Sequence, residues 1–128
     1  KYIAPQVIES CLSELKFIDQ VAVIGNQRKY VTALIVPEFR MIEEWAREHH
    51  INFESREDLC ASKEVNDMMK ERIDTLQQQL AHYEQIKRFT LLAHHFSMES
   101  GELTNTLKLR RPIICKNYKD VIDKMFEE

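Results

Sequence analysis

The residues best suited to chemistry lie in the stretch SGELTNTLKLRR, residues 100–111. Lys108 stands between two leucines, and Thr104 and Thr106 precede it at steps of two. If this segment is extended, the alternation places both hydroxyls and the ammonium on one side. A threonine hydroxyl can donate to an oxygen whose negative charge a lysine neutralises, so the pattern predicts a contact for an anion. Gly101 gives the loop before these residues the freedom to swing.

The same region holds the strongest charge asymmetry of the chain. Five cations and no acid lie in residues 108–119: Lys108, Arg110, Arg111, Lys116 and Lys119. We expect Arg111, Lys116 and Lys119 to be the solvated start of a helix, with surface pairing to nearby acids. The alternative is a stand-alone module that binds an anionic surface or RNA through the whole Lys108–Lys119 stretch. No aromatic residues interleave with these cations, which disfavours RNA.

Other kinds of site find little support in the sequence. Glycine occurs only at Gly25 and Gly101, so a glycine-rich phosphate loop is absent and a complete nucleotide enzyme is not expected. The three cysteines are far apart and lack a C-x-x-C pair, which favours free thiols in a reducing cytosol. The five histidines lack the spacing of metal ligands, so we expect no metal site.

Composition indicates one globular domain. The chain has 128 residues, of which 44% are hydrophobic and 30% charged, and its formal net charge is −3. This charge is too small to indicate a nucleic-acid or membrane partner. No apolar run reaches the roughly 20 residues of a membrane span, and no signal peptide opens the chain, so we expect a cytoplasmic protein. Because the sequence starts without methionine, we expect it to be an excised piece.

The hydrophobic pattern predicts helices and strands in a defined order. PQVIESCLSEL (residues 5–15) has helical spacing, and QVAVIG with KYVTALIVP predicts an antiparallel hairpin whose second strand ends at Pro37. A helix over residues 38–50 and an irregular segment over 51–61 follow. Ser62 is a candidate N-cap for a long helix that runs to about Glu84.

The second half of the pattern adds a strand and a final helix. IKRFTLLAHHF (residues 86–96) predicts the third strand, and Pro112 stands near the start of the last helix. No repeat or linker divides residues 1–128, which we therefore treat as one domain. The order predicts an α+β fold with a small, mainly antiparallel sheet covered by helices.

The stretch GELTNTLKLRR resembles the closing motif of the long-chain fatty acid–CoA ligases, roughly G-x-L-T-P-T-x-K-x-+-R. These are acyl-CoA synthetases of the adenylate-forming, AMP-binding superfamily. KYIAPQVIES resembles the segment after their interdomain hinge, VAVIGNQRKYVTALIVP their C-terminal hairpin, and IKRFTLLAHHFSMESGELT the strand and loop before the lysine. The resemblance covers essentially the whole chain, in order. Asn105 stands where the family usually has proline, so the loop is expected to be more mobile.

The resemblance implies that residues 1–128 are the mobile C-terminal domain of such a ligase, without its large N-terminal AMP-binding domain. The small domain would close over the ATP and fatty acid site for adenylation, then rotate for thioester formation with coenzyme A. ATP, Mg²⁺ and coenzyme A would be bound mainly or jointly by the large domain, so the isolated piece is expected to be inactive. Nucleic acid is not an expected partner, and the full-length enzyme could lie peripherally at a membrane.

The resemblance also implies roles for single residues. Lys108 would be catalytic, bridging the substrate carboxylate and the α-phosphate region, while Gly101, Thr104 and Thr106 support its loop. The two threonines either position this loop or cap it. Lys1 and Tyr2 would lie beside the hinge on the coenzyme A side, unless the terminus simply frays. Glu9 is either a structural helix residue, which we favour, or a contact to the large domain.

Overall fold

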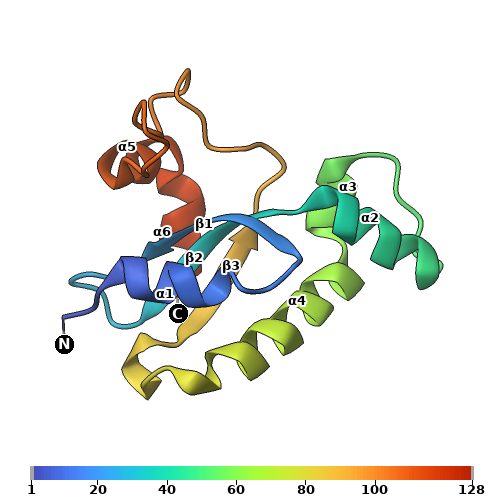
Figure 1. Cartoon of the computed structure of the whole chain (residues 1–128), viewed down its shortest axis with the longest axis horizontal. Coiled ribbons are helices and arrows are strands. Elements are labelled where there is room, and N and C mark those ends of the chain that lie inside the picture. Colours follow the sequence, from blue (N-terminus) through green and yellow to red (C-terminus); the bar gives the residue numbers. More distant parts are fainter. Residues whose placement is uncertain (1, 128) are drawn as a thin grey trace.

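The computed structural model describes residues 2–127 and centres on a three-stranded sheet (Figure 1). The strand order is β1 (Ile18–Ile24), β2 (Val31–Pro37), β3 (Ile86–Leu91). β1 and β2 form the predicted antiparallel hairpin, whereas β2 and β3 are parallel. The sheet is therefore mixed and not mainly antiparallel. The helices between β2 and β3 return the chain to the starting end of the sheet, which makes the second pairing parallel.

Helices surround this sheet and confirm the α+β class. They are α1 (Pro5–Leu12), α2 (Phe39–Glu48), α3 (Arg56–Ala61), α4 (Lys63–Leu76), α5 (Arg111–Asn117) and α6 (Lys119–Met125), with 3₁₀ turns at Gln77–Gln79 and His82–Glu84. α1 packs on β1 and on α4, and α6 packs on β3. In Figure 1, α2 and α3 extend to the right, and the loop after β3 rises to the top before it enters α5. Within residues 2–127, no helix has the length and apolar character that crossing a membrane requires.

The core is centred on β2. Every residue of this strand is buried, so both of its faces are covered as well as both of its edges. Ile8 and Leu12 of α1 and Met69 and Ile73 of α4 are also buried and belong to the same hydrophobic cluster. The sheet and its helices thus form one packed body.

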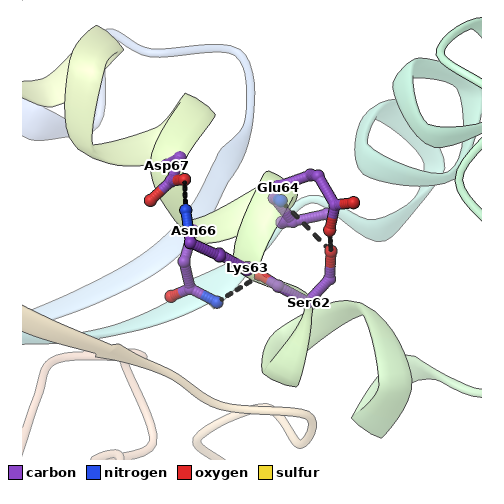
Figure 2. Close-up of polar contacts among 6 residues, drawn as sticks. Ser62, Lys63, Glu64, Asn66 and Asp67 are labelled. Carbon is purple, nitrogen blue, oxygen red and sulfur yellow. Dashed lines mark hydrogen bonds and ion pairs between the residues drawn. The ribbon is translucent and has the colours of Figure 1, made fainter.

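The start of α4 confirms the predicted cap at Ser62. Its hydroxyl accepts the Val65 N–H at 3.2 Å. The Asn66 side chain donates to the Ser62 carbonyl at 2.8 Å (Figure 2) and to the Cys60 carbonyl at 2.9 Å. Residues 51–61, predicted to be irregular, contain the short helix α3. Ser55 caps it by accepting the Asp58 N–H at 3.0 Å. Six helical residues are too few to give a clear hydrophobic period, so the prediction missed this helix.

α4 ends at Leu76, eight residues before the predicted end near Glu84. The buried side chain of Gln77 accounts for this. Its amide nitrogen donates to the Ile86 carbonyl at 3.0 Å, and its amide oxygen accepts the Ile86 N–H at 2.8 Å. These bonds tie the end of α4 to the first residue of β3. Leu80 is then only half-buried and Tyr83 is exposed, so neither continues the buried side of α4.

Candidate functional site: the lysine hairpin

The segment around Lys108 is a tight reversal of the chain. Leu103 and Leu109 form an antiparallel bridge, the Thr104 N–H donates to the Lys108 carbonyl at 2.8 Å, and the Leu107 N–H donates to the Thr104 carbonyl at 2.9 Å. We call residues 103–109 the lysine hairpin. The alignment of both threonines with the lysine required an extended segment, and this condition is not met, because the chain turns back between Thr104 and Lys108.

The threonine hydroxyls are used within the turn. Thr104 Oγ1 accepts the backbone N–H of Lys108 at 3.0 Å and lies 3.1 Å from Thr106 Oγ1. Side-chain oxygens of this kind satisfy the free N–H groups of a turn in place of a neighbouring strand. Of the two roles considered for the threonines, this geometry corresponds to capping the loop.

Lys108 is left free at the end of the hairpin. Its side chain is exposed, and its ammonium makes no hydrogen bond or ion pair with any residue in 2–127. The preceding residue, Leu107, has φ of 62° and is 67% exposed. A leucine in the left-handed region is uncommon and costs energy, and such strain is concentrated at functional sites. The hairpin thus presents a solvated cation directly after a strained residue.

A shallow hollow lies beside the lysine hairpin. Its volume is about 500 Å³, and its walls come from α1, β1 and the hairpin itself: Gln6, Glu9, Ser10, Ser13, Gln20, Val21, Leu103, Leu107 and Leu109. The α1 wall is mainly polar, whereas the hairpin wall consists of leucines. The exposed Leu107 therefore borders an open space on the surface of the domain.

The loop that leads into the hairpin is fixed to β1. The Gln20 side chain accepts the Phe96 N–H at 2.8 Å and donates to the Phe96 carbonyl at 3.2 Å. Next to it, His95 Nε2 lies 2.5 Å from an oxygen of Asp19. A side-chain amide that satisfies both backbone groups of one residue acts as a short piece of strand, so this part of the loop is held in place.

Gly101 makes the turn between that loop and the hairpin. Its φ is 79°, and its N–H donates to the Met98 carbonyl at 2.9 Å. A Cβ built here would approach only Ile113 Cγ2, at an ordinary 3.6 Å. The backbone conformation, and not lack of space, therefore favours glycine at this position.

The C-terminal side of the hairpin is held by Arg111. Its Nη1 donates to Glu9 Oε2 at 2.7 Å and to the Val23 carbonyl at 2.8 Å, and the same carboxylate oxygen accepts the Val23 N–H at 2.8 Å. The side chains of Arg111 and Glu9 are only 27% and 13% exposed. The prediction that Arg111 is solvated is therefore wrong. The structural role favoured for Glu9 agrees with these bonds.

A buried carboxylate lies under the hairpin. Glu102 is only 4% exposed and accepts the Asn117 side-chain N–H at 2.9 Å, and its carbonyl accepts the Arg110 N–H at 2.7 Å. Burial raises the pKa of the neighbouring Tyr118 phenol, and the negative charge of Glu102 adds to that rise. Sequence reasoning missed Glu102, since an acid in a polar loop gives no periodic signal of burial.

The remaining predicted residues lie apart from this arrangement. Tyr2 is 85% exposed, and Lys1 lies outside the described residues. Lys119 forms an exposed pair with Asp123 at 2.7 Å, as expected of surface charge. With Arg111 paired to Glu9, the cations do not act together, and the alternative of an anion- or RNA-binding surface finds no support. Residues 2–127 hold no group of three or more histidine, cysteine or acidic side chains placed to bind a metal.

Comparison with known proteins assigns the whole sequence to one family. The model of the AMP-binding enzyme C-terminal domain matches residues 1–128. Long chain acyl-CoA synthetase 2 of Arabidopsis thaliana is 28% identical over the whole chain, which covers 20% of that protein. Human long-chain-fatty-acid–CoA ligase 1 is 32% identical over 98% of the chain, which covers 18% of that protein. The chain thus spans about a fifth of the length of these curated relatives.

Solved structures show the same fold. The adenylation domain of a carboxylate reductase from Mycobacterium chelonae aligns with the whole chain with a TM-score of 0.79 and 21% identity, over 18% of its own length. The corresponding domain from Segniliparus rugosus, solved with AMP and a co-purified carboxylic acid, aligns with 98% of the chain and 18% of its own, with a TM-score of 0.77 and 19% identity. The mixed sheet, the lysine hairpin and the family match over residues 1–128 lead to one conclusion: the chain belongs to the family of AMP-binding enzyme C-terminal domains.

Proposed function

We propose that this chain is the mobile C-terminal domain of a long-chain fatty acid–CoA ligase and that Lys108 acts in its adenylation step. The observation that carries the proposal is the unpaired ammonium of Lys108, presented at the end of a hairpin whose two sides are fixed to the domain. The long-chain acyl-CoA synthetases among its relatives support the choice of reaction.

The reaction needs such a cation. A fatty acid carboxylate attacks the α-phosphate of ATP, so two anions must approach each other while negative charge grows on the phosphoryl oxygens. A lysine ammonium is a compact point charge on a long stem and can lie between both anions. A cation placed where charge develops, away from bulk water, stabilises the transition state by several kcal/mol. Lys108 would supply this charge when the domain closes, and pyrophosphate would leave.

The proposal assigns the other parts of the reaction to a large N-terminal AMP-binding domain of the same polypeptide. That domain would hold the fatty acid and ATP, with Mg²⁺ on the phosphates. After adenylation, this chain would rotate so that coenzyme A reaches the acyl-adenylate and displaces AMP. The exposed Tyr2 would then lie near the path of coenzyme A. We place the full-length enzyme in the cytoplasm or peripherally at a membrane.

The test uses the full-length enzyme with Lys108→Ala. ATP–pyrophosphate exchange, which reports adenylation, should fall by about 10²–10³. Thioester formation from supplied acyl-adenylate should stay near the wild-type rate, because this step does not need the cation at the α-phosphate. Lys119→Ala, which removes an exposed cation from α6, is the matched control and should leave both rates unchanged. Equal losses in the two steps for Lys108→Ala would contradict the proposed role.

A further inference from the structure

Two residues far apart in the sequence meet at the base of the lysine hairpin, by which we mean Glu102 and residues 110–114 on its two sides. Arg111 is the first residue of α5 and follows Lys108 by three positions, whereas Glu9 lies in α1. Their ion pair joins elements separated by 102 positions in the chain. It is also the least exposed ion pair found within residues 2–127, since the other pairs lie on open surface.

The pair is built into the sheet. One nitrogen of Arg111 and one oxygen of Glu9 together satisfy both backbone groups of Val23 in β1. Val23 itself is fully buried, and β1 is held by its whole antiparallel ladder with β2. The Arg111 guanidinium is therefore fixed to a buried residue of the sheet, close to the point where the lysine hairpin ends.

The two sides of the hairpin are anchored differently. On the N-terminal side, Phe96 is held by Gln20, but the turn at Gly101 still separates this anchor from Lys108. On the C-terminal side, only Leu109 and Arg110 separate Lys108 from Arg111. The Arg110 N–H donates to the Glu102 carbonyl, and the Arg110 carbonyl accepts the N–H groups of Ile113 and Ile114 in the first turn of α5. The shorter and more direct connection to the sheet thus runs through Arg111.

We propose that the Glu9–Arg111 pair is the positioning device of Lys108: it sets where the ammonium lies when the domain closes over the adenylation site. This inference rests on the proposed function. Neither Glu9 nor Arg111 touches the substrates; each acts through the backbone of residues 108–111. A displacement of about 1 Å at a reacting group can cost on the order of 10²-fold in rate. Loss of the ion pair that anchors the hairpin should therefore lower the adenylation rate measurably.

The experiment measures both half-reactions of the full-length enzyme with Arg111→Gln. We expect the turnover of ATP–pyrophosphate exchange to fall by about 10-fold or more, with the KM for ATP within about twofold of wild type. Thioester formation from supplied acyl-adenylate should change by less than about twofold. All assays are run well below the unfolding temperature of every variant. A variant that is merely less stable would lose both half-reactions together, and that outcome would overturn the inference.

Two further variants separate positioning from other roles. Because both contacts of Arg111 use one nitrogen, the single ammonium of Arg111→Lys can replace them, and this variant should recover most of the lost adenylation. In a Lys108→Ala background, Arg111→Gln should reduce adenylation no further, since no ammonium remains to be positioned. Independent, additive losses would contradict the inference.

The outcomes also distinguish this inference from the proposed function. If Lys108→Ala leaves adenylation intact, the proposed function fails and the inference fails with it. If Lys108→Ala abolishes adenylation and Arg111→Gln changes neither half-reaction, the proposed function stands and only the positioning role of the pair is wrong. Lys119→Gln, which breaks the exposed pair with Asp123, serves as the control and should behave as wild type in both assays.

Discussion

Lys108 and Arg111 are cations three residues apart, yet they are used in opposite ways. The side chain of Lys108 is exposed, and its ammonium makes no hydrogen bond or ion pair in the described part of the chain, residues 2–127. The guanidinium of Arg111 is half-buried and donates two hydrogen bonds, to the Glu9 carboxylate and to the Val23 carbonyl. The tip of the lysine hairpin, Leu107 and Lys108, is thus free, whereas its base is fixed to β1. The role proposed for Lys108, to bring a charge to a substrate on another domain, needs both a free end and a fixed support.

The tip and the base of the hairpin also differ in backbone conformation and in burial. Leu107 at the tip has a left-handed backbone and an exposed side chain, so its geometry is held by the turn against its own preference. The base contains the buried Glu102 and the fully buried Ile114 of α5. From this difference we expect changes at the base to lower stability and changes at the tip to leave it nearly intact.

The largest loss of stability should follow from Glu9→Gln or Arg111→Gln. Each change weakens a charge-assisted hydrogen bond at Val23, so the free energy of unfolding should fall by about 1.5–3 kcal/mol. The double variant should lose less stability than the sum of the two single losses, because both residues form the same ion pair. Urea denaturation of the 128-residue chain measures both. Lys108→Ala is the matched change at the tip and should alter stability by less than about 0.5 kcal/mol.

A smaller loss is expected from Gly101→Ala. The space for a methyl group is present, but a φ of 79° in a residue with a Cβ should cost about 1–2 kcal/mol of unfolding free energy. Gly101→Asn should cost less than alanine, because asparagine tolerates the left-handed region better. Thermal unfolding of the three proteins compares them directly. Equal stability of alanine and glycine at this position would show that the turn can relax.

The smallest change should be a gain, produced by Leu107→Gly. Glycine adopts φ near 62° without strain, so the free energy of unfolding should rise by up to about 1 kcal/mol. Leu107→Ala keeps the backbone strain and removes an exposed side chain, so its stability should stay close to wild type. Paired urea curves of the two variants test this. A destabilised glycine variant would mean that the leucine side chain, and not the turn, holds the tip.

Much of the fold follows from local pattern. The β1–β2 hairpin, the end of β2 at Pro37 and the cap at Ser62 each depend on residues close together in the sequence. The end of α4 does not, because it depends on the side chain of Gln77 reaching Ile86 in β3. The parallel pairing of β2 with β3 is likewise set by the path of the whole connection between them, and no short stretch encodes it.

The site divides along the same line. Lys108 stands out in the sequence because of its motif, and the structure shows that its side chain is exposed. In the sequence, Arg111 is one cation of the basic stretch 108–119, and nothing there distinguishes it from Lys116 or Lys119. Only the fold shows that it pairs with Glu9, 102 positions away. The role of the threonines also needed the turn to be seen, since an extended strand and a hairpin can share one alternating pattern.

The bonds at Val23 have a consequence for encounters between separate molecules. β1 is an outer strand of the sheet, and the unpaired side of such a strand is a template on which another chain can add. At Val23 a carboxylate and a guanidinium already occupy both backbone groups that an incoming strand would use. At this point of the border, a strand from a second copy of the domain would have to displace both side chains before it could pair with β1.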